Sequence, residues 1–340
     1  MSTPLPTTVT EVRLAQHLTD KLTLDNFDVV QVPLREPGAG EVVVRHDLMQ
    51  LAAVMPDLMR EGVEIPMPPF VVGEPLGAGG VGTVVASNSD DLPVGTTVYT
   101  GTWAEYSVGP AEEYWPLDTS VVPGPEYLLN QGTTAYYGMV DIAQVGEGDV
   151  VYVSGAAGGV GSLAGQIAKH RGAAKVIGSA GSAGKVAYLV EELGFDAAFD
   201  YRDGPIIDQL RTHAPDGITV FFDCVGGEQF EAAVQAAQPN ARFALCGALS
   251  GQVGGSDGAF PKLDLMTAIV RHLTLRPFAC HHTPEQMEAW NTAFATWMGE
   301  GTFVYPHTVV DATLAEAPQT LLDYLSGAYK GNTAIRFPQA

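Results

Sequence analysis

Cysteine, positive charge and long apolar runs are all scarce in this sequence of 340 residues. Its three cysteines, Cys224, Cys246 and Cys280, form neither an even set nor a CxxC motif, so structural disulfides are not expected. No apolar run approaches the roughly 18 residues of a membrane span, and we expect a globular protein. Lys and Arg number 17 against 39 Asp and Glu, and the net charge of −22 repels nucleic acid and anionic membranes. A small molecule is therefore the expected partner.

Two further absences concern the start of the chain and its regularity. Residues 1–10 contain no basic region followed by an apolar stretch, so no secretory signal is predicted and we expect a cytoplasmic location. No repeat at a fixed period and no low-complexity segment is found, which argues against a repeat architecture. The length allows two domains, each with its own core.

Strand and helix patterns divide the chain into two kinds of region. The first is mostly β, with strand-like segments at 9–14, 28–34, 41–45 and 101–108. From Tyr127 to about Gly301, helical and strand-like segments alternate, which is typical of a doubly wound parallel sheet. The remaining tail returns to strand, helix and strand, and most simply rejoins the first region. We therefore predict an α/β fold with two domains.

The glycine-rich segment 149–161, DVVYVSGAAGGVG, is the centre of the second region. An apolar, β-branched run leads into glycines at 155, 158, 159 and 161, just before an apolar-periodic segment, which predicts strand, tight turn and helix. Such a turn lets the backbone approach a pyrophosphate at the positive end of the helix dipole. Because the spacing departs from GxGxxG, a purely structural glycine-rich turn is the alternative.

Residues after the next strand-like segment, 175–178, favour NADP over NAD. An NAD site usually carries Asp or Glu there, about 20 residues after the glycines, to bind the ribose 2′-hydroxyl. Here residues 179–182 read SAGS, Lys185 follows, and Tyr201 and Arg202 come after a further predicted strand. The helix dipole disfavours a cation at the start of a helix, and a bound phosphate would offset this unfavourable interaction. The alternative for Lys185 is an ordinary solvated lysine.

Several segments together resemble one known family over nearly the whole chain. REGVEIPMPPFVVGEPLGAG, GTWAEYSV and QGTTAYYGM are similar to the quinone oxidoreductase group. AAGGVGSLAGQIAK, GSAGKVAYL, FDYR, FDCVGG and CGALS are similar both to that group and to the leukotriene/prostaglandin alkenal reductases. The chain thus resembles the zinc-independent branch of the medium-chain dehydrogenase/reductases. The resemblance implies a GroES-like β-barrel domain (1–124 and 302–340), an inserted Rossmann domain (125–301), and NADPH in the cleft between them.

The same resemblance implies a set of cofactor contacts. Gly158, Gly159 and Val160 would approach the pyrophosphate, and Ser179, Lys185 and Tyr201 the 2′-phosphate. Thr134, Gly247, Ala248 and Phe278 would lie along the nicotinamide half, and Cys224, Leu249 and Cys280 complete the predicted cofactor-binding residues.

Ligands for a catalytic zinc ion are missing where the wider superfamily carries them. In place of a Gly-His-Glu motif the chain has Gly73 and Glu74 without the histidine, and no cysteine precedes Cys224. We therefore predict no metal, and alcohol oxidation without a Lewis acid is disfavoured. NADPH-dependent reduction of an activated C=C bond, with hydride delivered to the β-carbon, fits best. Quinone reduction is the nearest alternative, and an NADPH-binding structural or regulatory protein is the alternative from another class.

The predicted substrate pocket departs from the family. Where alkenal reductases carry DPYM this chain reads AAVM, and a second tyrosine is replaced in PFACHHT, so that His281 stands nearest its place. An imidazole titrates near neutrality and can donate to a developing enolate oxygen, and we predict His281, or secondarily His282, as the proton donor. A structural histidine pair, with water or the cofactor ribose as donor, is the alternative. The predicted pocket residues are Met55, Met59, Phe70, Tyr137, His281 and His282, with core packing as the other interpretation of the first four.

Two features of the sequence concern the last sheet strand and the C-terminal loop. Residues 273–278, LTLRPF, form a β-prone run at the end of the predicted doubly wound sheet, and such an edge favours pairing with a second copy. We therefore predict a homodimer. Near the C-terminus, Tyr329 and Gly331-Asn332 stand where the family has Asn and Gly-Lys.

Overall fold

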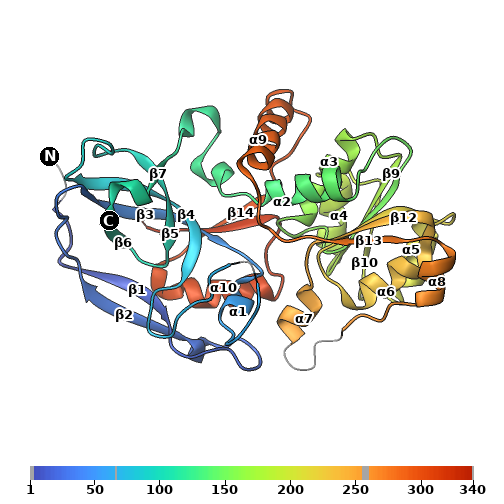
Figure 1. Ribbon diagram of the computed structural model, residues 1–340, viewed down its shortest axis with the longest axis horizontal. Coiled ribbons are helices and arrows are strands. Elements are labelled where there is room, and N and C mark those ends of the chain that lie inside the picture. Colours follow the sequence, from blue (N-terminus) through green and yellow to red (C-terminus); the bar gives the residue numbers. More distant parts are fainter. Residues whose placement is uncertain (1–3, 66, 255–259, 339–340) are drawn as a thin grey trace. The chain divides into compact units, whose positions relative to one another are not determined.

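A computed structural model describes residues 4–65, 67–254 and 260–338 of the chain (Figure 1). The described residues form two compact units. The first lies within Met1–Leu129, Thr308–Ala328 and Thr333–Ala340, and the second within Asn130–His307 and Tyr329–Asn332. No helix in the described ranges is long and apolar enough to span a bilayer. The domain limits expected from the sequence remain a prediction. They differ from these units at residues 125–129, which lie in the first unit, and at 302–307 and 329–332, which lie in the second.

The first unit is built mainly from antiparallel strands. Its strands and helices are β1 (Thr8–Leu14), β2 (Phe27–Pro33), β3 (Glu41–Leu51), α1 (Met55–Leu58), β4 (Gly77–Ser87), β5 (Thr97–Thr102), β6 (Tyr106–Pro110), β7 (Trp115–Pro116), β14 (His307–Asp311), α10 (Ala317–Leu325) and β15 (Asn332–Arg336). Short 3₁₀ turns lie at Leu24–Asn26, Ala111–Glu113, Thr119–Val121, Pro125–Leu128 and Leu314–Glu316. One sheet has the order β14-β15-β3-β4-β5-β7, with β6 also on β3, and β1 pairs with β2.

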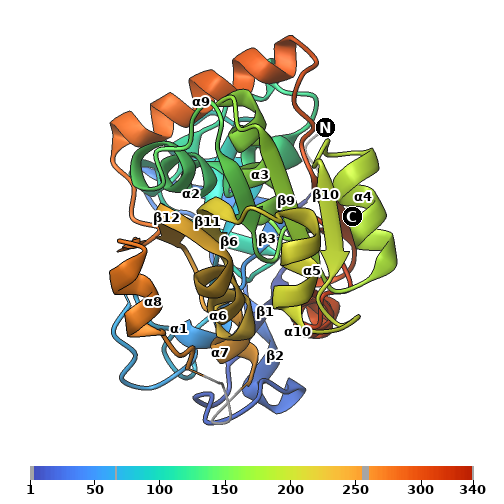
Figure 2. The same ribbon diagram turned by 90° about the vertical axis from the view of Figure 1, so that its right-hand side faces the viewer.

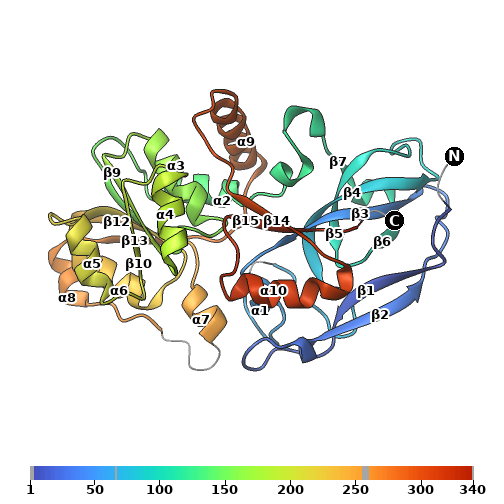
Figure 3. The same cartoon turned by 180° about the vertical axis from the view of Figure 1, so that it is seen from behind.

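Both ends of the chain contribute to that larger sheet. The C-terminal strand β15 pairs antiparallel with β3, with Thr333 opposite Leu51, and Figure 3 shows β14, β15 and α10 from behind. This pairing explains why β3 runs to Leu51, beyond the 41–45 segment expected from its alternation. Glycines let β4 cross close to its neighbours, because a Cβ at Gly82 would lie 2.5 Å from the carbonyl oxygen of Arg45.

The second unit contains a six-stranded parallel sheet with helices around it (Figure 2). Its elements are α2 (Gly132–Tyr137), a π-helical turn (Gly138–Ile142), β8 (Val150–Val153), α3 (Gly161–His170), β9 (Lys175–Ala180), α4 (Ala183–Glu191), β10 (Ala197–Asp200), α5 (Ile206–His213), β11 (Ile218–Asp223), α6 (Gly227–Ala236), β12 (Ala237–Leu245), α7 (Leu249–Gly254), α8 (Leu265–Val270), β13 (Thr274–Pro277) and α9 (Pro284–Gly299). The strand order β10-β9-β8-β11-β12-β13 is that of a Rossmann fold. The predicted two-part α/β fold is confirmed.

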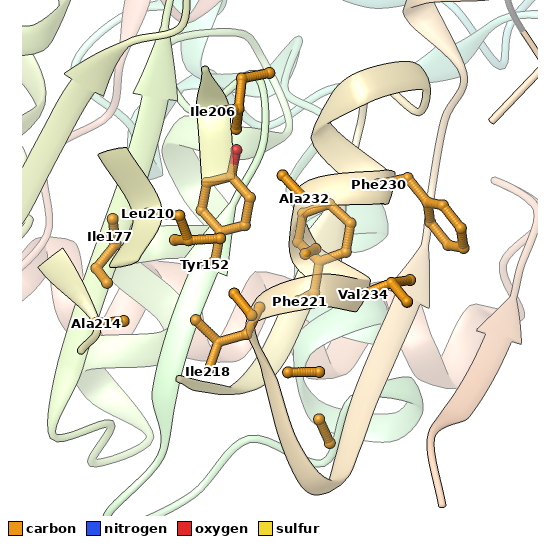
Figure 4. Packing of buried hydrophobic residues seen from close by; sticks show 14 of the residues in the cluster. Tyr152, Ile177, Ile206, Leu210, Ala214, Ile218, Phe221, Phe230, Ala232 and Val234 are labelled. Carbon is orange, nitrogen blue, oxygen red and sulfur yellow. The ribbon is translucent and has the colours of Figure 1, made fainter. Parts of the chain in front are cut away.

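Alternating side chains of this sheet form cores on its two faces. Tyr152, Ile177 and Phe221 pack against α5 and α6 in one cluster of buried residues (Figure 4). On the other face, a Cβ at Gly178 would meet Leu189 of α4 and Phe195 at 3.0 Å. The central strands β8, β9 and β11 are buried on both faces, and their sequences are therefore rich in apolar residues without a strict alternation. The parallel arrangement brings the carboxyl ends of all six strands to one edge, where ligands of such folds bind.

Candidate functional site

The glycine-rich loop follows β8 at the point where the strand order reverses. Gly155 adopts a positive φ of 58°. A Cβ at Gly161 would lie 2.6 Å from the carbonyl oxygen of Gly155, and a Cβ at Gly159 would lie 2.5 Å from Oε1 of Gln131. Gly158 is exposed, and a Cβ there would lie 3.3 Å from the carbonyl oxygen of Gly155. The loop is therefore closely packed at Gly159 and Gly161 and exposed at Gly158. Because it lies at the start of α3, its backbone suits the approach of a pyrophosphate.

A segment from the C-terminal end of the chain holds this loop. The backbone N–H of Gly331 donates to the carbonyl of Ala157 at 2.8 Å. Asn332 accepts from the N–H of Gln131 through Oδ1 at 2.9 Å and donates through Nδ2 to the carbonyl of Gly159 at 3.3 Å. Asn332 and Gln131 are site residues that sequence reasoning missed, because the two lie 201 positions apart and no local pattern joins them.

The ends of β9 and β10 bring together the predicted 2′-phosphate residues Lys185 and Tyr201. The Tyr201 ring lies over Gly181, where a Cβ would be only 3.0 Å from the ring, and the Arg202 guanidinium lies 5.4 Å from the Tyr201 ring centroid. Ser182 caps α4 by accepting from the N–H of Lys185. Burial lowers the pKa of Lys185, and the charges of Arg202 and Lys330 lower it further. Arg202 therefore lies beside Tyr201, and Arg202 and Lys330 both act electrostatically on Lys185, a charge pattern that suits a phosphate.

Ser179 is a correction to the predicted set. Its side chain is completely buried, and its hydroxyl hydrogen-bonds with Gln229 at 3.0 Å and Tyr152 at 3.1 Å. Because side chains alternate along β9, Ser179 lies on the same face as Ile177, towards α6. The hydroxyl is therefore a core group that is not presented to a phosphate.

Asp223, at the end of β11, organises the central loops. It accepts from Ser154 Oγ at 2.7 Å and from the N–H groups of Val225 and Gly226, each at 2.9 Å. Burial raises the pKa of Asp223, while these hydrogen bonds oppose the increase. Ser154 in turn accepts from the N–H of Cys224 at 2.8 Å. A charged residue that ends an apolar strand was the sequence signal available for Asp223.

The predicted residues after β12 and β11 also lie at this edge. Gly247 donates its N–H to the carbonyl of Asp223 at 3.0 Å, and Leu249 donates to the carbonyl of Cys224 at 3.3 Å. A Cβ at Gly247 would lie 3.0 Å from the Cys224 carbonyl oxygen, so glycine permits this close approach. Ala248 is exposed.

The three cysteines lie after three neighbouring strands. A hydrogen bond with Cys246, followed by burial, raises the pKa of Cys224. Burial also raises the pKa of Cys280, and the nearby Cys246 adds to the effect. All three are free cysteines. The raised pKa values favour the protonated thiol at Cys224 and Cys280.

An aromatic cluster joins α2 to the segment after β13. The rings of Tyr137 and Phe278 meet edge to face at 5.7 Å, and those of Tyr137 and His282 at 5.8 Å. Nε2 of His282 lies 2.9 Å from Oγ1 of Thr134. Burial lowers the pKa of His282, as does His281, while the Gln286 side chain raises it. The adjacent His281 is exposed. Four predicted site residues, Thr134, Tyr137, Phe278 and His282, therefore come together within the second unit.

Three predicted pocket residues belong to the first unit. Met55 and Met59 are 2% and 0% exposed and lie in a buried cluster with Leu14 and Trp103, and Phe70 packs against it. Their arrangement shows core packing, and a substrate contact by any of them remains a prediction. In the described part of the chain, no group of three or more His, Cys, Asp or Glu side chains is placed to hold a metal ion.

The residues at this edge fit an NADP cofactor. The loop that opens above Gly158 suits the pyrophosphate, and the cations near Tyr201 suit a 2′-phosphate. The aromatic cluster around Tyr137 offers an apolar surface beside the carboxyl end of β13.

Comparisons with known proteins agree with this geometry. A family model described as zinc-binding dehydrogenase matches residues 159–296, and one described as N-terminal domain of oxidoreductase matches residues 10–117. Prostaglandin reductase 1 of Mus musculus is 32% identical, over 95% of this chain and 97% of its own. The NADPH-dependent curcumin reductase of Escherichia coli is 29% identical, over 92% of each. Among solved structures, CurA from Vibrio vulnificus in complex with NADPH has a TM-score of 0.89 at 28% identity, covering 97% of this chain and 100% of that one.

Proposed function

The chain belongs to the zinc-independent branch of the medium-chain dehydrogenase/reductase superfamily and is an NADPH-dependent oxidoreductase, and from this premise we propose that it reduces a C=C bond conjugated to a carbonyl group. The carrying observation is the Tyr137, Phe278 and His282 cluster at the carboxyl edge of the sheet, close in the chain to the cofactor residues. It combines apolar rings with a hydrogen-bonding imidazole, the surface that a conjugated carbonyl compound requires. The names of the curcumin and prostaglandin reductases support the same substrate class.

We further propose the division of labour among the cofactor residues. Gly158, Gly159 and Val160 bind the pyrophosphate, because their loop is backbone-lined and sits at the N-terminus of α3. Lys185 and Tyr201 bind the 2′-phosphate. Thr134, Gly247, Ala248 and Phe278 flank the nicotinamide half, since they lie after the central strands and on α2.

NADPH, when bound, supplies the hydride that the β-carbon of the substrate receives. The remaining task for the protein is to stabilise negative charge on the carbonyl oxygen and to provide a proton. The proposed donor to the carbonyl oxygen is one of the pair His281 and His282. The contact between His282 and Thr134 supports His282, because a catalytic donor must be held in position, whereas His281 is exposed.

Neutral His282 can donate a hydrogen bond without carrying charge. Burial lowers its pKa, so the ring is mainly neutral near pH 7 and one ring nitrogen keeps its proton. The 2.9 Å contact between Nε2 of His282 and Oγ1 of Thr134 fixes the orientation of the ring. In this scheme the imidazole polarises the carbonyl oxygen, and Tyr137 holds the ring edge to face.

A substrate panel tests the proposed activity. Purified protein is mixed with NADPH and simple enones, enals, quinones and alcohols, and NADPH absorbance is followed. Turnover of enones with kcat/KM at least tenfold above that for quinones supports the proposal. Preferential quinone turnover overturns it in favour of quinone reduction, and tight NADPH binding without turnover of either class overturns it in favour of a binding role.

We also propose a cytoplasmic homodimer in which β13 pairs with its counterpart. β13 is the last strand of its sheet, and α8 just before it exposes Leu265, Met266, Ile269 and Val270. An apolar helix face beside an open strand edge is a surface that a second copy can cover.

A further inference from the structure

The segment Tyr329–Asn332 has a fixed position on the second unit. Gly331 forms an isolated bridge with Gly158, and its N–H donates to Ala157 at 2.8 Å. Gly331 has a φ of 65°, and a Cβ there would overlap the carbonyl oxygen of Pro306. Only glycine fits this position without strain. The adjoining Lys330 therefore projects from an anchored backbone.

Lys330 lies along the face of α4 that begins at Lys185. Its Nζ is 4.2 Å from the centroid of the Tyr188 ring and 3.9 Å from Oε1 of Glu192. Lys185, Tyr188 and Glu192 are three and four positions apart, so they share one face of the helix. The cation–π contact with Tyr188 keeps the Lys330 ammonium on that face, near Lys185.

Three cations from separate parts of the sequence therefore lie along α4 and the neighbouring end of β10. Lys185 comes from α4, Arg202 from the segment after β10, and Lys330 from the C-terminal segment. Burial lowers the pKa of Lys185, and the charges of Arg202 and Lys330 lower it further. Only 17 of the 340 residues are Lys or Arg, against 39 acidic ones. The charges of Arg202 and Lys330 repel that of Lys185, and a bound polyanion offsets this repulsion.

We propose that Lys330 is a specificity-determining residue that adds a third cation to the adenosine 2′-phosphate site. This inference rests on the proposed function in one respect, the placement of the 2′-phosphate beside Lys185 and Tyr201. The C-terminal segment then has two tasks: Gly331 and Asn332 hold the pyrophosphate loop, and Lys330 reads the phosphate that distinguishes NADPH from NADH.

Calorimetric titration with two adenosine nucleotides tests Lys330 without any catalytic step. The probes are 2′,5′-ADP, which carries the 2′-phosphate, and 5′-AMP, which lacks it. Lys330→Met should weaken 2′,5′-ADP binding by about 5- to 10-fold and leave 5′-AMP within twofold, since it removes a partly exposed charge. Lys330→Arg should restore most of the preference. Lys169→Met is the matched control. Lys169 lies on α3 with its Nζ 2.7 Å from Oδ1 of Asp196, and its loss removes the same net charge.

A comparison with Lys185→Met separates the possible failures. If Lys185→Met lowers the 2′,5′-ADP preference and Lys330→Met does not, the role of Lys330 is wrong and the proposed phosphate site stands. If neither variant changes the preference, the proposed position of the 2′-phosphate is itself wrong. An equal loss in Lys169→Met would also overturn the inference, because net charge alone would then explain it.

Discussion

His46 is a buried histidine whose two ring nitrogens both have partners. It is 3% exposed; Nδ1 lies 2.9 Å from the carbonyl oxygen of Thr102, and Nε2 lies 2.8 Å from Ser107 Oγ. A carbonyl only accepts, so Nδ1 carries the proton and Nε2 of the neutral ring accepts from Ser107. The hydroxyl of Tyr114 donates to Ser107 at 2.9 Å and completes the chain.

This arrangement predicts a pH-dependent stability. Burial lowers the pKa of His46 from 6.5 to about 4. Between these values the unfolded chain binds a proton that the folded chain does not, so the free energy of unfolding falls as pH drops from about 6.5 to about 4. The loss should approach about 3 kcal/mol. Denaturant unfolding followed by tryptophan fluorescence across this range measures it. His46→Gln should flatten the slope, whereas the exposed His281→Gln should not; equal slopes in wild type and His46→Gln would refute the assignment.

The histidine pair after β13 yields a second residue-scale prediction. His282→Ala should lower turnover of an enone by about 10²-fold, as expected for a lost hydrogen-bond donor to the carbonyl oxygen, with little change in NADPH affinity. Because burial lowers the pKa of His282, the dependence of kcat on that ring should appear below the usual histidine range. His281→Ala is the paired variant. A large loss in His281→Ala alone would return the role to the exposed residue, and normal kcat in both would assign the proton to water or the cofactor ribose.

At the scale of elements, helix α3 shows how tightly one face of the sheet is packed. A Cβ at Gly165 would overlap the ring of Phe195, which is 2% exposed and follows α4. The absence of a side chain at Gly165 lets α3 lie close to the sheet and thereby sets the position of the glycine loop at its N-terminus.

Substitution at Gly165 should therefore be costly. Gly165→Ala should lower the free energy of unfolding by about 1–3 kcal/mol because the ring cannot move without disturbing the core. Gly299→Ala in α9 is the matched control, since a Cβ there meets nothing within 4 Å. That change should be neutral or raise stability by up to about 1 kcal/mol. Thermal denaturation of both variants measures the difference, and similar melting temperatures would show that Phe195 can yield.

At the scale of the whole molecule, the proposed homodimer predicts a mass near twice the 35.8 kDa of one chain. α8 exposes Ile269 by 62% and Val270 by 68%, beside the open edge of β13. Multi-angle light scattering measures the mass at working concentration. Ile269→Glu should shift the mass towards that of one chain, because a buried unpaired charge opposes association. Leu24→Glu, which changes an exposed leucine in the first unit, should leave the mass unchanged. A wild-type mass of 35.8 kDa would contradict the proposal.

Much of the architecture was determined by local sequence alone. The apolar run before Gly155 and the periodic segment after Gly161 specify strand, turn and helix, because each depends on neighbouring residues. The alternation after Tyr127 predicted the parallel sheet for the same reason. Right-handed crossovers then bring the carboxyl ends of the strands to one edge, so Lys185, Tyr201, Gly247 and the segment after Phe278 could be predicted to gather there.

Other features were decided only by the tertiary structure. Ser179 has the sequence position of a phosphate contact, yet strand alternation turns its hydroxyl into the core towards Gln229. His282 rather than His281 meets Thr134, and Asn332 reaches Gln131 and Gly159 across most of the chain. Lys330 reaches the Tyr188 ring of α4 in the same way. Each of these contacts joins residues far apart in sequence, and which side chains meet is fixed by strand register and helix packing, which local sequence patterns do not encode.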